Sequence, residues 1–120
     1  MSYNISSWKI KKLDSLAIPV KALCEGNNYF DAPRLDISTG IYTIPGMDGT
    51  EIIGRIDGPM IHVSDITCYG EGSGSAYGVL FDALKQSTGM LTVSCVWEGG
   101  DSITRLTVVN GDVTEEDIEL

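Results

Sequence analysis

The sequence predicts an α+β domain spanning residues 1–120, in which a mainly antiparallel sheet of about six to eight short strands carries one principal α-helix near residues 75–88 on one face. Segments rich in Ile, Val, Thr and Tyr recur along the chain, as in β-strands. Turn signals that contain glycine separate them at intervals typical of hairpins. Only one segment, after a glycine-rich stretch, combines helical spacing of apolar residues with helix start and stop signals.

The strand candidates lie between turn signals such as Ser38-Thr39-Gly40 and Asp57-Gly58-Pro59. They are RLDIS, IYTI, TEIIGRI, MIHVSDITCY, MLTVSCVW and SITRLTVV. The first 25 residues are ambiguous, because their apolar residues have helix-like spacing from Leu13 to Leu23 while Pro19 would break a helix interior. We expect two short strands in this region.

The last two strand candidates predict a register. If EGGD closes a hairpin, Cys95 faces Thr104 and Leu91 faces Val108, on an apolar surface that can carry the helix. The opposite surface of the same ribbon is suited to partial exposure or to an interface, and its apolar members are Met90, Val96, Ile103 and Val109.

Asn110-Gly111 is the strongest hairpin signal in the chain, because a type I′ turn needs a positive φ at both central residues. Continued pairing beyond this turn would set Glu115 beside the core-facing Leu106. We therefore expect the last strand to stop near Thr114. The TEED pattern that follows is a capping box, which favours a helical turn in the tail.

The predicted helix has start and stop signals as well as an apolar face. Ser75 is a suitable N-cap and Gly89 is suited to the C′ position after the helix. Four residues at helical spacing should face the sheet: Tyr77, Leu80, Phe81 and Leu84.

The chain has a net charge of −9, and most of this charge is in its second half. Residues 61–120 contain ten acidic residues against two basic ones. Such a charge repels nucleic acid and anionic lipid and attracts basic proteins. The three cysteines form no C-x-x-C pair, and the sequence has neither a signal-peptide pattern nor a long apolar run. These features predict a cytoplasmic protein that does not bind membranes.

No motif in the sequence assembles a catalytic, cofactor or metal site. The loop Gly70–Gly78 lacks the lysine of a P-loop and the third glycine of a dinucleotide fingerprint. On one straight strand, His62 and Cys68 would lie too far apart to share a metal ion. We expect no catalytic residue, no cofactor and no metal, and hence no enzyme.

The leading hypothesis is a small acidic binding protein, an immunity- or antitoxin-type inhibitor that neutralises a basic toxin enzyme such as a nuclease. One alternative is a small-molecule-binding or enzymatic domain with a pocket at the Gly70–Gly78 loop, beside Ser73, Ser75 and Tyr77. Another is an oligomeric structural module that associates through the ribbon surface of Met90, Val96, Ile103 and Val109, which we call the half-apolar ribbon surface. For the leading hypothesis, the partner-binding residues are Glu98, Asp101, Asp112, Glu115, Glu116, Asp117 and Glu119.

Overall fold

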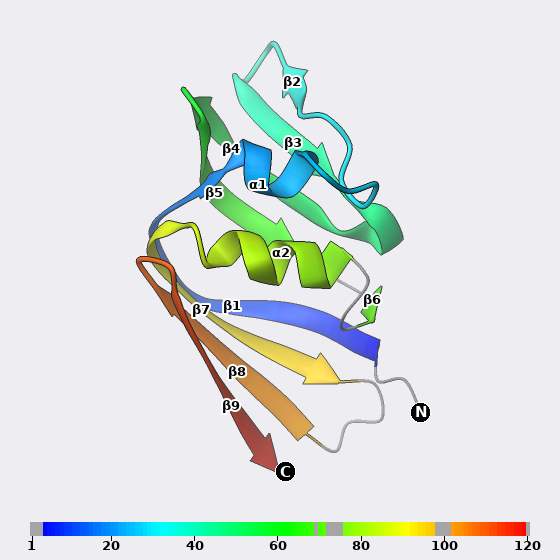
Figure 1. Ribbon diagram of the computed structural model, residues 1–120, viewed down its shortest axis with the longest axis vertical. Coiled ribbons are helices and arrows are strands. Elements are labelled where there is room, and N and C mark those ends of the chain that lie inside the picture. The colour runs from blue at the N-terminus through cyan, green and yellow to red at the C-terminus, as the bar shows by residue number, and fades with distance from the viewer. Residues whose placement is uncertain (1–3, 69, 72–75, 98–101, 120) are drawn as a thin grey trace.

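The computed structural model describes residues 4–68, 70–71, 76–97 and 102–119, which form one antiparallel sheet and two short helices (Figure 1). This arrangement confirms the predicted α+β class. The helices are α1 (Val20–Cys24) and α2 (Ala76–Leu84), and a 3₁₀ turn, η1, covers Met47–Gly49. The strands are β1 (Asn4–Pro19), β2 (Arg34–Asp36), β3 (Ile41–Pro45), β4 (Glu51–Asp57), β5 (Met60–Thr67), β6 (Gly70–Glu71), β7 (Thr88–Trp97), β8 (Ser102–Val109) and β9 (Asp112–Glu119).

The sheet has the strand order β2-β3-β4-β5-β1-β7-β8-β9, and the short β6 pairs with the start of β1. In the described part of the chain, β2 and β9 are therefore the two edges. The strand candidates between residues 34 and 109 are confirmed as β2, β3, β4, β5, β7 and β8. Neither helix is long enough to cross a bilayer, which requires about 20 residues, since the longer one, α2, has nine.

The expectation of two short strands before residue 25 is wrong. One long strand, β1, runs to Pro19 and is followed directly by α1. Pro19 is the N-cap of α1, where its fixed φ and its missing N–H do not disturb the helix. β1 contains three irregularities in its pairing with β7, and Ser15 has a φ of 54° at the last of them. These bulges explain why its apolar residues lack a strand-like alternation.

The predicted helix is present but ends at Leu84, not near Gly89. The side-chain hydroxyl of Ser87 donates a 2.7 Å hydrogen bond to the carbonyl of Leu84 at this end. Gly89 lies instead within β7 with a φ of 85°, where an added Cβ would lie 2.1 Å from the carbonyl oxygen of Ser15. A glycine is needed at this position because the backbone of β7 passes close to the β1 bulge. The prediction that Gly89 is the C′ residue of the helix is therefore wrong.

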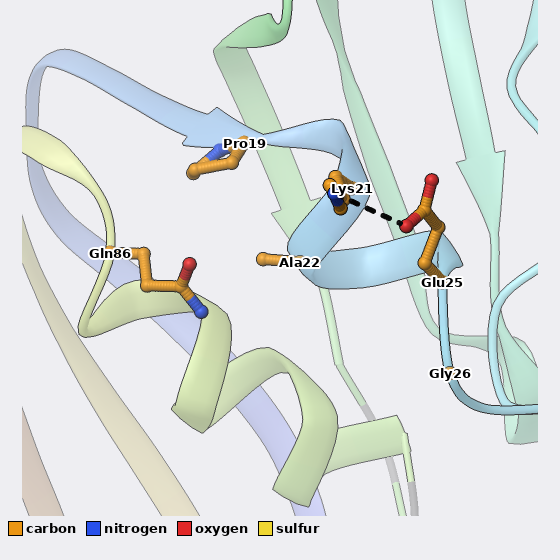
Figure 2. A pocket seen from close by; sticks show the side chains of 6 residues that line it. All are labelled: Pro19, Lys21, Ala22, Glu25, Gly26 and Gln86. Carbon is orange, nitrogen blue, oxygen red and sulfur yellow. Dashed lines mark ion pairs between the residues drawn. The ribbon is translucent and has the colours of Figure 1, made fainter.

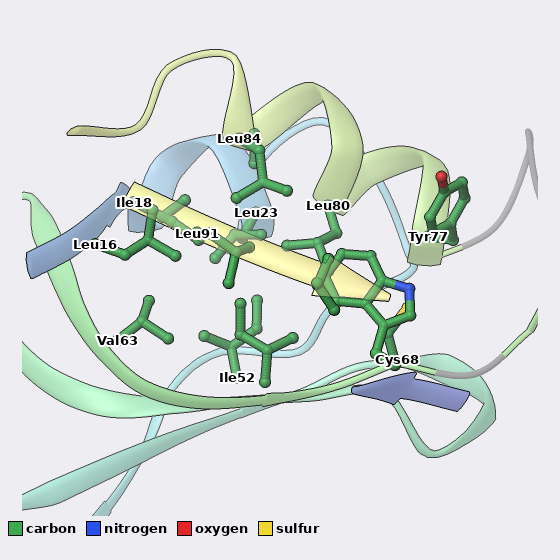
Figure 3. Close-up of a cluster of buried hydrophobic side chains, with 14 of the residues drawn as sticks. Leu16, Ile18, Leu23, Ile52, Val63, Cys68, Tyr77, Leu80, Leu84 and Leu91 are labelled. Atoms are coloured by element: carbon green, nitrogen blue, oxygen red, sulfur yellow. The ribbon is translucent and has the colours of Figure 1, made fainter. Parts of the chain in front are cut away.

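The buried side chains form one apolar cluster between the helices and the sheet. Tyr77, Leu80 and Leu84 of α2 are buried in it, as the helical spacing predicted, whereas Phe81 is half-buried. In Figure 3, Leu80 and Leu84 point toward Leu91 of β7, and side chains of β4 and β5 close the cluster from the other side. Helix and sheet are thereby fixed to each other.

The predicted register of the C-terminal ribbon is confirmed. Cys95 pairs with Thr104 and Leu91 with Val108, and all four side chains are buried. We call this surface of the sheet the helix side and the opposite surface the outer side.

Candidate functional site

The acidic residues nearest the C-terminus lie on β9, the edge strand that ends at the C-terminus in Figure 1. Asn110 and Gly111 turn the chain into it with φ angles of 48° and 84°, as a type I′ hairpin requires. Four carboxylates along β9 are exposed, and these belong to Asp112, Glu115, Glu116 and Asp117.

Two of these carboxylates lie on the helix side. Glu115 is opposite Leu106 and Asp117 is opposite Thr104, both of which are buried. The hydroxyl of Thr104 donates a 2.8 Å hydrogen bond to Oδ1 of Asp117. Asp117 is therefore held in one position at the margin of the core.

The other two carboxylates lie on the outer side, because side chains alternate along a strand. Asp112 is opposite Val109, and Glu116 is opposite the exposed Arg105. The sequence 115–117 thus presents acidic groups on both sides of one sheet edge.

The expected end of the last strand near Thr114 is wrong, and so is the expected helical turn in the tail. β9 continues to Glu119, and Glu115 does pair with Leu106. Leu106 is fully buried although its β9 neighbour is charged, because β9 is the outermost strand and the Glu115 side chain is exposed beyond it. An edge position therefore tolerates a charge that an interior strand would not.

For the remaining three predicted binding residues, the structure describes no side chain. Glu98 and Asp101 lie outside the described residues. The backbone of Glu119 ends β9 opposite Ser102. The candidate surface therefore consists of the four exposed acids of β9, and we call it the β9 edge.

The turn before β9 is anchored to the rest of the molecule. The backbone N–H of Asn110 donates to the carbonyl of Gly89 at 2.8 Å, and its Oδ1 accepts from the N–H of Gly89 at 2.9 Å. Gly111 packs against the segment after α2, since an added Cβ would lie 2.7 Å from the carbonyl oxygen of Lys85. These contacts fix the β8–β9 hairpin against both β7 and the end of the helix.

The two acids on the helix side of β9 contribute to the raised pKa of the buried Tyr77. Burial raises the pKa of Tyr77 far above its ordinary value, and electrostatic interactions with Cys95, Glu115, Cys68 and Asp117 raise it further, in that order. Tyr77 also makes an edge contact with Trp8, with ring centroids 6.0 Å apart. The indole Nε1 of Trp8 is buried and has no hydrogen-bond partner among the described residues.

Two buried thiols lie near this aromatic pair. Burial, chiefly, raises the pKa of Cys68 and of Cys95 to about 12, so both are neutral thiols at physiological pH and poor nucleophiles. His62 is exposed on β5, whereas Cys68 is buried. Among the described side chains, no three of the His, Cys, Asp and Glu type come close enough to hold a metal ion.

A shallow depression of about 440 Å³ lies elsewhere, between α1 and the end of α2 (Figure 2). It is lined by Pro19, Lys21, Ala22, Glu25, Gly26 and Gln86. Lys21 and Glu25 form an exposed ion pair of 3.8 Å at its rim. The depression is wide open, and its two charged groups, Lys21 and Glu25, are exposed, so it offers little to orient a substrate.

The structure describes the Gly70–Gly78 loop only in part. Ser73 and Ser75 lie outside the described residues, and Tyr77 is packed into the core with 8% of its surface exposed. The half-apolar ribbon surface lies on the outer side, as its register predicted. Its members Met90, Val96 and Ile103 are half-buried, and Val109 is 41% exposed.

The groups that hold β9 in place were not predicted from the sequence. The bond from Thr104 to Asp117 and the contacts of Asn110 with Gly89 join residues that are distant in the chain. Only the paired strand register could have indicated the first, and it would have required extending β9 past Thr114.

Comparisons with known proteins do not assign the chain to a family. The chain matches no protein-family model, no curated protein and no solved structure.

Proposed function

We propose that this chain is a non-catalytic binding protein that docks a basic protein partner on the β9 edge, as an immunity- or antitoxin-type inhibitor would. The observation that carries the proposal is the row of exposed carboxylates along one anchored edge strand. A nuclease or other enzyme with a cationic groove has the complementary charge. No disulfide joins Cys24, Cys68 and Cys95, which supports a cytoplasmic location for such an inhibitor.

The four acids of the β9 edge, Asp112, Glu115, Glu116 and Asp117, form no ion pair with a described basic residue. In the part of the chain that the structure describes, the ion pairs join Lys21 to Glu25 and Lys85 to Asp82, and neither involves β9. Across the sheet from Glu116, Arg105 is the nearest basic residue in the register, but the two form no ion pair. The charge of the β9 edge therefore remains available to a partner.

The backbone that carries these charges is held in place, which favours specific docking over diffuse attraction. The hairpin turn is hydrogen-bonded to Gly89, and Asp117 is hydrogen-bonded to Thr104. Because these groups are already ordered, binding loses less conformational entropy than it would with a disordered acidic tail.

The test is capture from an extract of the native cells with the immobilised protein at low salt, followed by identification of what binds. The β9 variant replaces three acids with lysine, Asp112→Lys, Glu115→Lys and Glu116→Lys, and leaves the Thr104–Asp117 bond intact. The matched control variant carries Glu51→Lys, Asp57→Lys and Asp65→Lys, three exposed acids of β4 and β5. Both variants change the net charge equally.

We expect one basic protein to bind the wild-type chain and the control variant and to be lost from the β9 variant. Raised ionic strength should release it, because exposed charges separated by more than about 8–10 Å are screened at physiological salt. A partner that binds the β9 variant as well as it binds the control variant would refute the assignment of this surface, and a partner with no basic surface would refute the function.

A further inference from the structure

We propose that the partner contributes an extended basic segment that adds to the sheet as a further strand alongside β9. This inference rests on the proposed function and specifies how the β9 edge makes its contact. Two observations carry it: no other described strand pairs with the outward edge of β9, and the acidic side chains of β9 lie on both sides of the sheet.

β9 offers backbone groups as well as charges. It spans eight residues, and all its described pairing is with β8. In an antiparallel pair, alternate residues direct their N–H and C=O groups toward the partner strand, and the residues between them direct these groups outward. In the described part of the chain, no strand pairs with this outward row. A row of unpaired donors and acceptors is a template for another strand.

The charges define the side chains that such a segment needs. In a paired strand, each side chain lies on the same side of the sheet as the residue opposite it, with Cβ atoms about 4.5–5.5 Å apart. Glu115 and Asp117 lie on the helix side, and Glu116 lies on the outer side. Three consecutive basic residues opposite 115–117 therefore meet one carboxylate each. A segment with a single basic residue would meet one of the three.

A second copy of this chain is a poor occupant of the β9 edge. Pairing of β9 with another β9 would bring rows of carboxylates together, and like charges directly opposite each other destabilise a sheet. The acids thus block self-association and admit a strand of opposite charge. The opposite edge, β2, has only three residues and carries the exposed Leu35, so it lacks this combination.

The probe is a fluorescent seven-residue peptide, Thr-Val-Arg-Arg-Arg-Val-Thr, titrated with the full chain at low salt and followed by polarisation. Two further peptides have the same sequence with N-methyl groups on alternate residues. One peptide is methylated at the odd positions and the other at the even positions. A methyl group prevents an N–H from pairing only where that N–H faces β9. Strand addition therefore predicts that one methylated peptide loses about tenfold or more in affinity while the other binds like the parent.

Two measurements complete the test. The β9 variant should lose binding of the parent peptide, and the control variant on β4 and β5 should retain it. Saturating peptide should slow hydrogen exchange at outward-facing amides of β9 and leave those of β2 unchanged.

The outcomes separate the two proposals. Equal binding by both methylated peptides, together with loss of binding in the β9 variant, would overturn strand addition and leave acidic docking intact. No binding of the parent peptide at low salt would also overturn strand addition, whereas capture from the extract tests the function independently. A peptide-bound chain without added protection in β9 would overturn strand addition as well.

Discussion

Replacing Gly111 with alanine should loosen the hairpin that carries the β9 edge. Gly111 has a φ of 84°, and an added Cβ would lie 2.7 Å from the carbonyl oxygen of Lys85 and 3.3 Å from that of Ser87. Both neighbours are backbone atoms, so they cannot move aside by a rotamer change. The matched control is Gly26→Ala, since Gly26 has a φ of 78° and its added Cβ would have nothing within 4 Å.

The two substitutions share one cost and differ in another. Placing a side chain in the left-handed region costs about 1–2 kcal/mol at either position. At Gly111 the overlap with the Lys85 carbonyl adds a cost typical of overpacking, about 1–3 kcal/mol. Gly26→Ala should therefore lower the free energy of unfolding by about 1–2 kcal/mol, and Gly111→Ala by about 2–5 kcal/mol.

Urea unfolding of both variants measures this difference at unchanged m-value, and hydrogen exchange locates it. Gly111→Ala should speed exchange in β8 and β9, whereas Gly26→Ala should not. Equal losses of stability in the two variants would refute the contact between the β8–β9 turn and the end of α2, and with it the rigid mounting of the β9 edge.

The remaining predictions concern the core and its titration. Leu106→Ala should cost about 2–5 kcal/mol in urea unfolding, since this side chain is fully buried, while Val109→Ala, at a 41% exposed position, should cost less than about 1 kcal/mol. Thr104→Val, which removes the hydrogen bond to the β9 carboxylate, should cost about 1 kcal/mol, and no loss would show that this bond contributes nothing. Burial raises the pKa of Cys68 and Cys95 from 9.0 to about 12, so their contribution to stability should be complete below pH 9 and decline as the pH rises toward 12. Urea midpoints from pH 8 to 11 that stay constant would contradict this.

The parts of the fold that the sequence predicted are those with a local signal. The helix side of the β7–β8 ribbon carries a buried residue at every second position, and the turn before β9 consists of the two residue types that tolerate a positive φ. The face of α2 that carries Leu80 and Leu84 repeats at helical spacing. Each of these signals is contained within about ten neighbouring residues.

The parts that were missed depend on contacts between distant residues. β9 has polar residues on both sides of the sheet, so it lacks the alternation by which strands are recognised, and only its edge position makes Glu115 acceptable opposite Leu106. Gly89 fits a helix end as well as it fits a strand, and its contact with Ser15 decided between them. The binding site was predicted as a set of acids, but their division between two sides of an edge required the register.

The rate at which a purified cationic partner associates with the chain, at two salt concentrations, tests most directly whether the β9 carboxylates attract it. The wild-type chain and the β4–β5 control variant should associate quickly at low salt, and the β9 variant should associate about tenfold more slowly with a weaker dependence on salt. Equal association rates for the two lysine variants at both salt concentrations would contradict this prediction.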